Sequence, residues 1–190
     1  RDYPECDGLV TNDPGVTLMI FTADCTPILL HDPVTGAVGA AHAGWRGTAS
    51  AIAAKTVAAM TREFGTRPED IRAAIGPNLA QCHFETDLDV PAAMIAAYGE
   101  DIQTFIRQKG EKYYPDLKAI NAYALRQAGV RQIAILADDA GNQGGSHYTK
   151  MLTDMTAWIK EMQVEYPDLK ILLPFVTQEY MGYGQSYYRT

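Results

Sequence analysis

The chain has 190 residues, 47% of them apolar and 21% charged, with a net charge of −7. This composition is that of a globular protein, and the length is sufficient for one ordinary domain with a large core. Because Lys and Arg are not clustered, the acidic balance argues against a nucleic-acid or anionic-membrane partner. No apolar stretch approaches the roughly 18 residues of a membrane span.

Hydrophobic patterning in the first third of the chain predicts strands, a hairpin and a helix. The continuous apolar run Val16–Phe21 is typical of a strand buried on both faces. The predicted elements, in order, are a strand near Leu9–Thr11, a strand over Val16–Phe21, hairpin arms over Pro27–Leu30 and Ala37–Ala41, and a helix from an N-cap at Thr48 or Ser50 to Phe64, closed by Gly65.

The rest of the chain alternates strand and helix patterns. The predicted elements are strand Ile71–Ile75, helix Val90–Tyr98, helix Leu117–Ala128, strand Val130–Leu136, helix Met151–Tyr166 and strand Ile171–Val176, with residues 99–115 left unassigned. Since one hairpin is antiparallel within this alternation, we expect an α/β protein with a mixed sheet.

The predicted hairpin carries Cys25 near one end and His42 near the other. A four-residue loop, 32–35, pairs His31 with Gly36 and sets Cys25 opposite His42, with Cβ atoms about 4.5–5.5 Å apart. A loop longer by one residue turns Cys25 and His42 to opposite faces. The sequence permits both registers.

A thiolate and an imidazole are ligands that suit zinc or copper. A catalytic zinc normally has three protein ligands, and His31, His83 or His147 could supply the third. Asp24 could then act as a general base or support a ligand. The alternative is a buried thiol near a core histidine, with Asp24 capping a turn.

Three further segments could contact a substrate. Gly44–Gly47 precedes a helix, where free N–H groups and the Arg46 guanidinium could bind an anion, or the arginine could simply be solvated. The aromatic tail with Tyr187 and Arg189 could line a pocket for a flat ring, or be exposed. Cys82 and His83 are adjacent and would face opposite ways on a strand, which favours a core or loop role.

Several motifs of this chain resemble the laccase-domain family, whose members are called multicopper polyphenol oxidases or purine nucleoside phosphorylases. The resemblance rests on Cys6–Thr11, on Thr22–Pro27 with its Ala-Asp-Cys, and above all on His-Ala-Gly-Trp-Arg-Gly at 42–47. Ile75–Pro77 and the segment from Asp116 to Val130 continue it.

The resemblance implies an α/β/β/α sandwich of the kind found in YfiH and cytotoxic necrotizing factor. It also implies a zinc or copper ion held by Cys25 and His42, with a third ligand from a histidine upstream of Asp7. Because this requires Cys25 and His42 on one face, the resemblance predicts the four-residue loop. On this basis we expect 1–190 to be a single laccase-like domain without the family's first part and extreme C-terminus. Residues 144–184 are expected to be an insertion.

The function implied is metal-dependent phosphorolysis of purine nucleosides (adenosine, inosine, guanosine and methylthioadenosine), with adenosine deamination as a companion activity. Arg46, Tyr187 and Arg189 would hold phosphate or substrate, and Asp24 would transfer protons. The alternative is copper-dependent oxidation of phenols, although four histidines are too few for a conventional blue multicopper oxidase.

A non-catalytic binding protein is the third alternative for the function.

The three cysteines have no disulfide-framework spacing, so we expect a reducing, cytoplasmic location. Small molecules are the expected partners.

Overall fold

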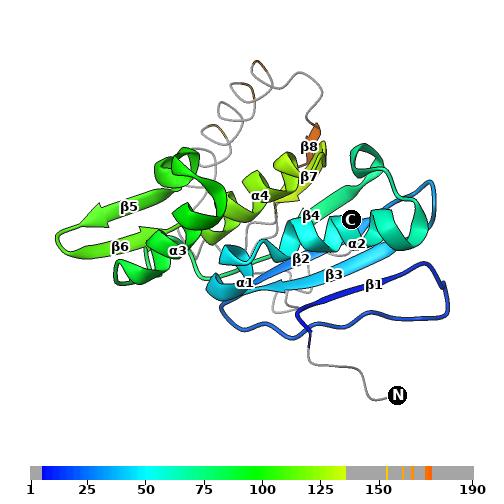
Figure 1. Ribbon diagram of the computed structural model, residues 1–190, viewed down its shortest axis with the longest axis horizontal. Coiled ribbons are helices and arrows are strands. Elements are labelled where there is room, and N and C mark those ends of the chain that lie inside the picture. Colours follow the sequence, from blue (N-terminus) through cyan, green and yellow to red (C-terminus); the bar gives the residue numbers. More distant parts are fainter. Residues whose placement is uncertain (1–5, 136–152, 154–159, 161–163, 165–169, 173–190) are drawn as a thin grey trace, which may run out of the picture.

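The structure is a computed structural model that describes residues 6–135, 153, 160, 164 and 170–172. It is organised around a six-stranded sheet with the order β1-β3-β2-β4-β7-β8 (Figure 1). The strands are β1 (Gly8–Thr11), β2 (Thr26–His31), β3 (Val38–Ala43), β4 (Arg72–Ile75), β7 (Gln132–Ile135) and β8 (Lys170–Leu172). The pairs from β1 to β4 are antiparallel and the pairs from β4 to β8 are parallel. The predicted α/β class with a mixed sheet is therefore confirmed.

Helices α2 and α4 lie across one face of this sheet (Figure 1). The helices are α1 (Trp45–Ala49), α2 (Ile52–Phe64), α3 (Asp89–Tyr98) and α4 (Leu117–Gln127), with 3₁₀ turns η1 (Pro68–Asp70) and η2 (Glu100–Phe105). A separate hairpin, β5 (Ile106–Lys109) and β6 (Lys112–Pro115), projects beside α3 (Figure 1). Of the implied sandwich, the described residues form the six-stranded sheet and one helix layer, with the two-stranded β5–β6 sheet apart from both.

The core lies between the sheet and helices α2 and α4. Alternate residues of β2, Ile28 and Leu30, are buried against Val57 and Met60 of α2. Full burial of such side chains contributes about 1.5–3 kcal/mol each. The intervening Leu29 points to the opposite, outer face, where it is 53% exposed. The two faces of the sheet are thus chemically distinct environments.

The β2–β3 loop has six residues, 32–37, so the predicted four-residue loop is wrong. His31 pairs with Val38, and Pro27 pairs with His42. The extra length is stabilised by the buried Asp32 carboxylate, which accepts hydrogen bonds from the Val34 N–H (2.8 Å) and the Thr35 hydroxyl (2.6 Å). Because the register differs from the predicted one by an even number of residues, every side chain keeps its face.

The predicted buried strand over Val16–Phe21 is wrong. No described strand pairs with this segment, and Val16, Met19 and Phe21 are 48%, 63% and 84% exposed. An apolar run predicts burial only if other elements cover it, and the helix layer lies on the other face of the sheet.

The predicted single helix ending at Phe64 is divided in two. Ala51 has a left-handed backbone (φ 58°) that ends α1 and precedes α2. Trp45–Gly47, predicted to precede the helix, form its first turn instead. Gly65, also left-handed at φ 68°, closes α2 as predicted.

Farther along the chain, strand β4 and helices α3 and α4 are close to their predicted positions, whereas hairpin β5–β6 was not predicted. The strand predicted at Ile171–Val176 begins one residue earlier, as β8, and pairs with β7. The predicted helix Met151–Tyr166 and most of the expected insertion lie outside the described residues. Within the described part of the chain, no helix is long and apolar enough to cross a membrane.

Candidate metal centre

Cys25 and His42 are brought together at the end of the β2–β3 hairpin. Since Pro27 pairs with His42, Cys25 falls opposite Gly44 and diagonally across from His42, on the outer face. A Cβ atom at Gly44 would lie 3.0 Å from the Cys25 Sγ and 3.7 Å from the His42 Cε1. Cys25 Sγ and His42 Cε1 are therefore no farther apart than the sum of these two distances. That separation is compatible with two ligands that share one ion.

Asp7 contacts His42 through both its side chain and its backbone. The Asp7 Oδ1 lies 3.0 Å from the His42 Nδ1, and the Asp7 carbonyl accepts the His42 backbone N–H at 2.8 Å. Antiparallel pairing of β1 with β3 continues to this pair of residues. The other ring nitrogen, Nε2, is the one left for a ligand. No role for Asp7 was predicted from the sequence.

The electrostatic surroundings of Cys25 favour the neutral thiol when no cation is present. Burial raises the pKa of the Cys25 thiol, and the negative charges of Asp24 and Asp7 raise it further. A bound cation would offset both carboxylates and displace the thiol proton. Any binding of a metal to this thiol would therefore be coupled to proton release.

The described residues supply two candidate ligands, Cys25 and His42, and no third. No group of three His, Cys, Asp or Glu side chains able to hold a metal occurs among them. His31 lies at the far end of β2, four residues from Pro27 and so about 13 Å away along the strand. His147 lies outside the described residues. The donor set present fits a metal, because a ligating histidine normally donates its other N–H to a carboxylate, as His42 can to Asp7.

Cys82 and His83 contact each other, contrary to the expectation from a strand. Both are exposed and lie at a turn, where the Cys82 Sγ is 3.1 Å from the His83 Nδ1. The expectation of opposite faces fails because the alternation of a strand does not apply to a turn. Neither residue fills the core.

Arg46 is exposed on α1, with its guanidinium 4.2 Å from the centre of the Trp45 ring. Helix α1 is held in place through Thr48. The Tyr98 hydroxyl donates to the Thr48 carbonyl (2.6 Å), and the Asn121 Nδ2 donates to the Thr48 hydroxyl (2.9 Å). Burial raises the pKa of Tyr98 to about 12. These two anchors come from α3 and α4, far away in the sequence.

Tyr187 and Arg189, predicted to contact substrate, lie outside the described residues.

A hydrogen bond between side chains supports the segment next to Cys25. The Asn78 Nδ2 donates to the hydroxyl of buried Thr26 at 2.9 Å, while the Asn78 Oδ1 has no hydrogen-bond partner among the described residues.

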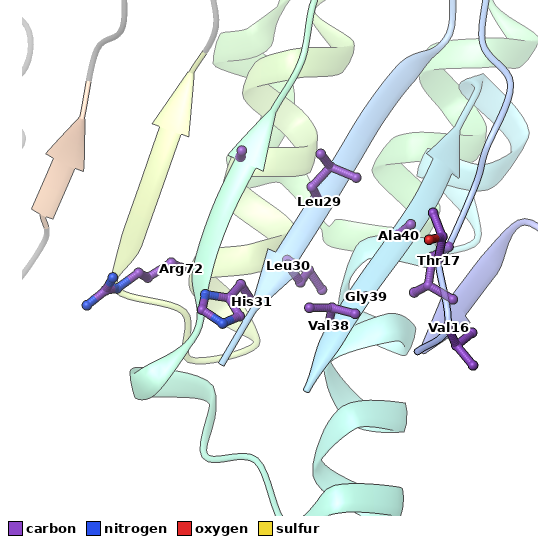
Figure 2. A pocket seen from close by; sticks show the side chains of 11 residues that line it. Val16, Thr17, Leu29, Leu30, His31, Val38, Gly39, Ala40 and Arg72 are labelled. Carbon is purple, nitrogen blue, oxygen red and sulfur yellow. The ribbon is translucent and has the colours of Figure 1, made fainter. Parts of the chain in front are cut away.

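A hollow of about 420 Å³ lies on the outer face of the sheet (Figure 2). Leu29, Val38, Ala40 and the segment 16–18 line it, and His31 and Arg72 lie at one end. His42 is two residues beyond Ala40 on the same face, outside the hollow. The hollow and the Cys25–His42 pair are therefore neighbouring but separate features.

Residues 1–148 match the protein family described as multi-copper polyphenol oxidoreductase laccase. The chain belongs to this family. It is 44% identical over 126 residues to a purine nucleoside phosphorylase of Deinococcus radiodurans, a match that covers 66% of this chain and 48% of that protein. It is 39% identical over 125 residues to adenosine deaminase RL5 of an unknown prokaryotic organism, covering 65% of this chain and 47% of that protein.

Among solved structures, this family member is similar to the hypothetical protein YfiH of Bacillus licheniformis. The TM-score is 0.66 at 38% sequence identity, and the match covers 68% of this chain and 49% of that one. The chain thus spans about half the length of these relatives.

Proposed function

We propose that this chain carries part of the active site of a metal-dependent enzyme that cleaves purine nucleosides by phosphorolysis. The observation that carries the proposal is the Cys25–His42 pair, with Asp7 bound to the far nitrogen of the imidazole. The names of its relatives, purine nucleoside phosphorylase and adenosine deaminase, support a nucleoside as the substrate.

Cys25 and His42 would hold the zinc or copper ion, with a third ligand from outside the described residues. Such an ion supplies Lewis acidity and can lower the pKa of bound water toward about 7. Gly44 places no side chain in the space that borders both Cys25 Sγ and His42 Cε1.

In the proposed reaction, a phosphate oxygen forms a bond to the sugar C1′ while the bond from C1′ to the purine nitrogen breaks. The products are the free base, which takes up a proton, and the sugar 1-phosphate. Arg46, exposed and without a carboxylate partner among the described hydrogen bonds, would bind the phosphate. Asp24, next to the thiol, would transfer the proton, and Tyr187 with Arg189 would contact the substrate.

We propose adenosine, inosine, guanosine and methylthioadenosine as substrates, with deamination of adenosine as a second activity. In deamination, water replaces the amino group of the base and ammonia leaves.

The proposed partners are these small molecules, and neither nucleic acid nor membrane. All three cysteines are free thiols, as a reducing cytoplasm would keep them.

The test is hypoxanthine release from inosine and phosphate by the full chain supplied with zinc. We expect Cys25→Ala to abolish release and Cys82→Ala, which removes an exposed thiol of the turn at 82–83, to retain it. Equal rates in the two variants would contradict the assignment of Cys25. Binding of inosine without any turnover by the wild type would instead identify a non-catalytic binding protein.

Copper-dependent oxidation of phenols is the second candidate, because the family description names that chemistry. The chain has four histidines, and only His42 joins Cys25 in the described residues, so any such oxidase would use an unconventional site. The same variants supplied with copper and a phenol test it. Oxidation that persists in Cys25→Ala would place the copper elsewhere.

A further inference from the structure

We propose that Asp7 is a positioning residue that holds the His42 imidazole with its proton on Nδ1 and presents the bare Nε2 to a divalent metal ion beside Cys25. This inference rests on the proposed metal-dependent function. It assigns a role to a residue that belongs to neither ligand position and that precedes His42 by 35 residues.

The first argument is that Asp7 and His42 are attached twice. Their backbones pair through the His42 N–H and the Asp7 carbonyl at 2.8 Å, and their side chains meet at 3.0 Å. Directly opposite residues of an antiparallel pair have Cβ atoms within about 5.5 Å, so the backbone alone brings the carboxylate to the ring. The contact therefore does not depend on a chance arrangement of two long surface side chains.

The second argument concerns the direction of the hydrogen bond. An ionised carboxylate can only accept hydrogen bonds, so a neutral imidazole that bonds to Asp7 through Nδ1 must carry its proton there. The lone pair of Nε2 is then free, and it is the lone pair that binds a metal. Asp7 thus selects the one neutral tautomer that can act as a ligand through Nε2.

The third argument is the placement of the ring. A Cβ atom at Gly44 would lie 3.7 Å from His42 Cε1, the atom between the two ring nitrogens, and 3.0 Å from Cys25 Sγ. The imidazole and the thiol therefore border the same space. With Nδ1 engaged by Asp7, the remaining nitrogen on that side of the ring is Nε2. On the β1 side Asp7 bonds to the imidazole, and on the β2 side Cys25, which is close enough to Asp24 to feel its charge, borders the same space.

The direct test is nuclear magnetic resonance of ¹⁵N-labelled, metal-free full chain at pH 8, where ring-nitrogen shifts distinguish the two tautomers. The His42→Gln variant assigns the signals. We expect Nδ1–H in the wild type and a shift toward Nε2–H in Asp7→Ala. Asp87→Ala is the matched control, since Asp87 is an exposed carboxylate paired with Lys112 on the β5–β6 hairpin. An unchanged tautomer in Asp7→Ala would overturn the proposal.

The second readout is zinc affinity, measured by competition with a chromophoric chelator. Loss of a residue that orients a metal-bound histidine weakens binding about 10–100-fold. We expect that loss in Asp7→Ala and a smaller one in Asp7→Asn, whose amide oxygen can still accept. Affinity within about two-fold of the wild type in both variants would contradict the positioning role.

The two readouts separate this inference from the function on which it rests. A wild type that has the Nδ1–H tautomer but binds no zinc would contradict the metal function while leaving the Asp7–His42 coupling intact. Thermal unfolding of each variant shows whether the fold is retained. Zinc binding lost in Asp7→Ala through unfolding would be revealed there. A folded Asp7→Leu variant, whose side chain fills similar space but cannot accept a hydrogen bond, then decides the question, because Nδ1–H retained in that variant would overturn the proposal.

Discussion

Gly44 leaves room beside the Cys25 sulfur, because a Cβ atom at position 44 would lie only 3.0 Å from Sγ. The backbone of Gly44 is ordinary extended chain (φ −68°), so conformational freedom is not the reason for a glycine here. The requirement comes from the thiol and the imidazole, which border the same space.

We therefore expect Gly44→Ala to fold but to bind zinc about ten-fold more weakly, through displacement of one ligand of a metal site. Zinc competition measures the affinity, and circular dichroism checks the fold. Gly15→Ala is the matched control, because its added Cβ would meet only the flexible Asp13 carboxylate, at 3.3 Å. Equal zinc affinities for the two variants would show that the space above Gly44 is not part of the metal site.

Asp32 makes the stability of the β2–β3 loop dependent on pH. Burial by itself raises the pKa of Asp32, but hydrogen bonds from Thr35, Val34 and Thr66 outweigh it and lower the pKa below the ordinary value. A carboxyl whose pKa is lowered by folding stabilises the protein above its unfolded pKa, near 3.9. That contribution is lost as the pH falls through the folded pKa.

We expect Asp32→Asn to lower the free energy of unfolding by about 1–3 kcal/mol at pH 6, the usual cost of disrupting buried, charge-assisted hydrogen bonds. The difference from the wild type should shrink as the pH falls below about 4, where the wild type also loses the charge. Urea titrations at pH 6, 4 and 3 measure it. A constant difference at all three values would mean that the charge of Asp32 does not stabilise the loop.

Thr48 and Asn121 should be energetically coupled. The buried Asn121 amide donates to the Thr48 hydroxyl at 2.9 Å and to the Leu117 carbonyl at 2.8 Å. We expect Asn121→Leu and Thr48→Val each to cost about 1–3 kcal/mol, because each leaves a polar partner unsatisfied. The double variant should cost less than the sum of the two, and additive costs would show that the bond contributes nothing.

Phe21 tests whether the segment 16–21 is exposed, as in the structure, or buried in a strand, as its sequence pattern predicts. A phenylalanine in a strand buried on both faces costs about 3–5 kcal/mol when truncated. Because Phe21 is 84% exposed, we expect Phe21→Ser to change the unfolding free energy by no more than about 0.5 kcal/mol. Chemical denaturation of the full chain measures this difference. A cost of several kcal/mol would show that other residues cover this segment.

Local patterns predicted most of the regular elements. The apolar run Pro27–Leu30 located β2, and the helix pattern located α4, whose N-cap Asp116 accepts from the Ala119 N–H. Loop length could not be predicted, since the Asp32–Thr35 network extends to Thr66, a partner from another part of the fold. The run Val16–Phe21 was misassigned because hydrophobicity does not reveal which face is covered.

The candidate site was predictable to the extent that residue type is informative. The residue types of Cys25 and His42 predicted a metal site only for a register that keeps them on one face. They do share a face, although the loop is two residues longer than expected. Asp7 could not be found in this way, because it reaches His42 only through the pairing of β1 with β3. Asn121 was missed for the same reason, since its partner Thr48 is 73 residues away.

The six-residue β2–β3 loop also limits how this hairpin can diverge. Adding or removing two residues leaves Cys25 and His42 on the same face, whereas adding or removing one inverts one arm relative to the other. Gain or loss of a single codon in this loop would therefore separate the ligand pair even if both strands still formed. Over evolution, the length of the hairpin should change in even steps wherever the proposed metal centre is kept.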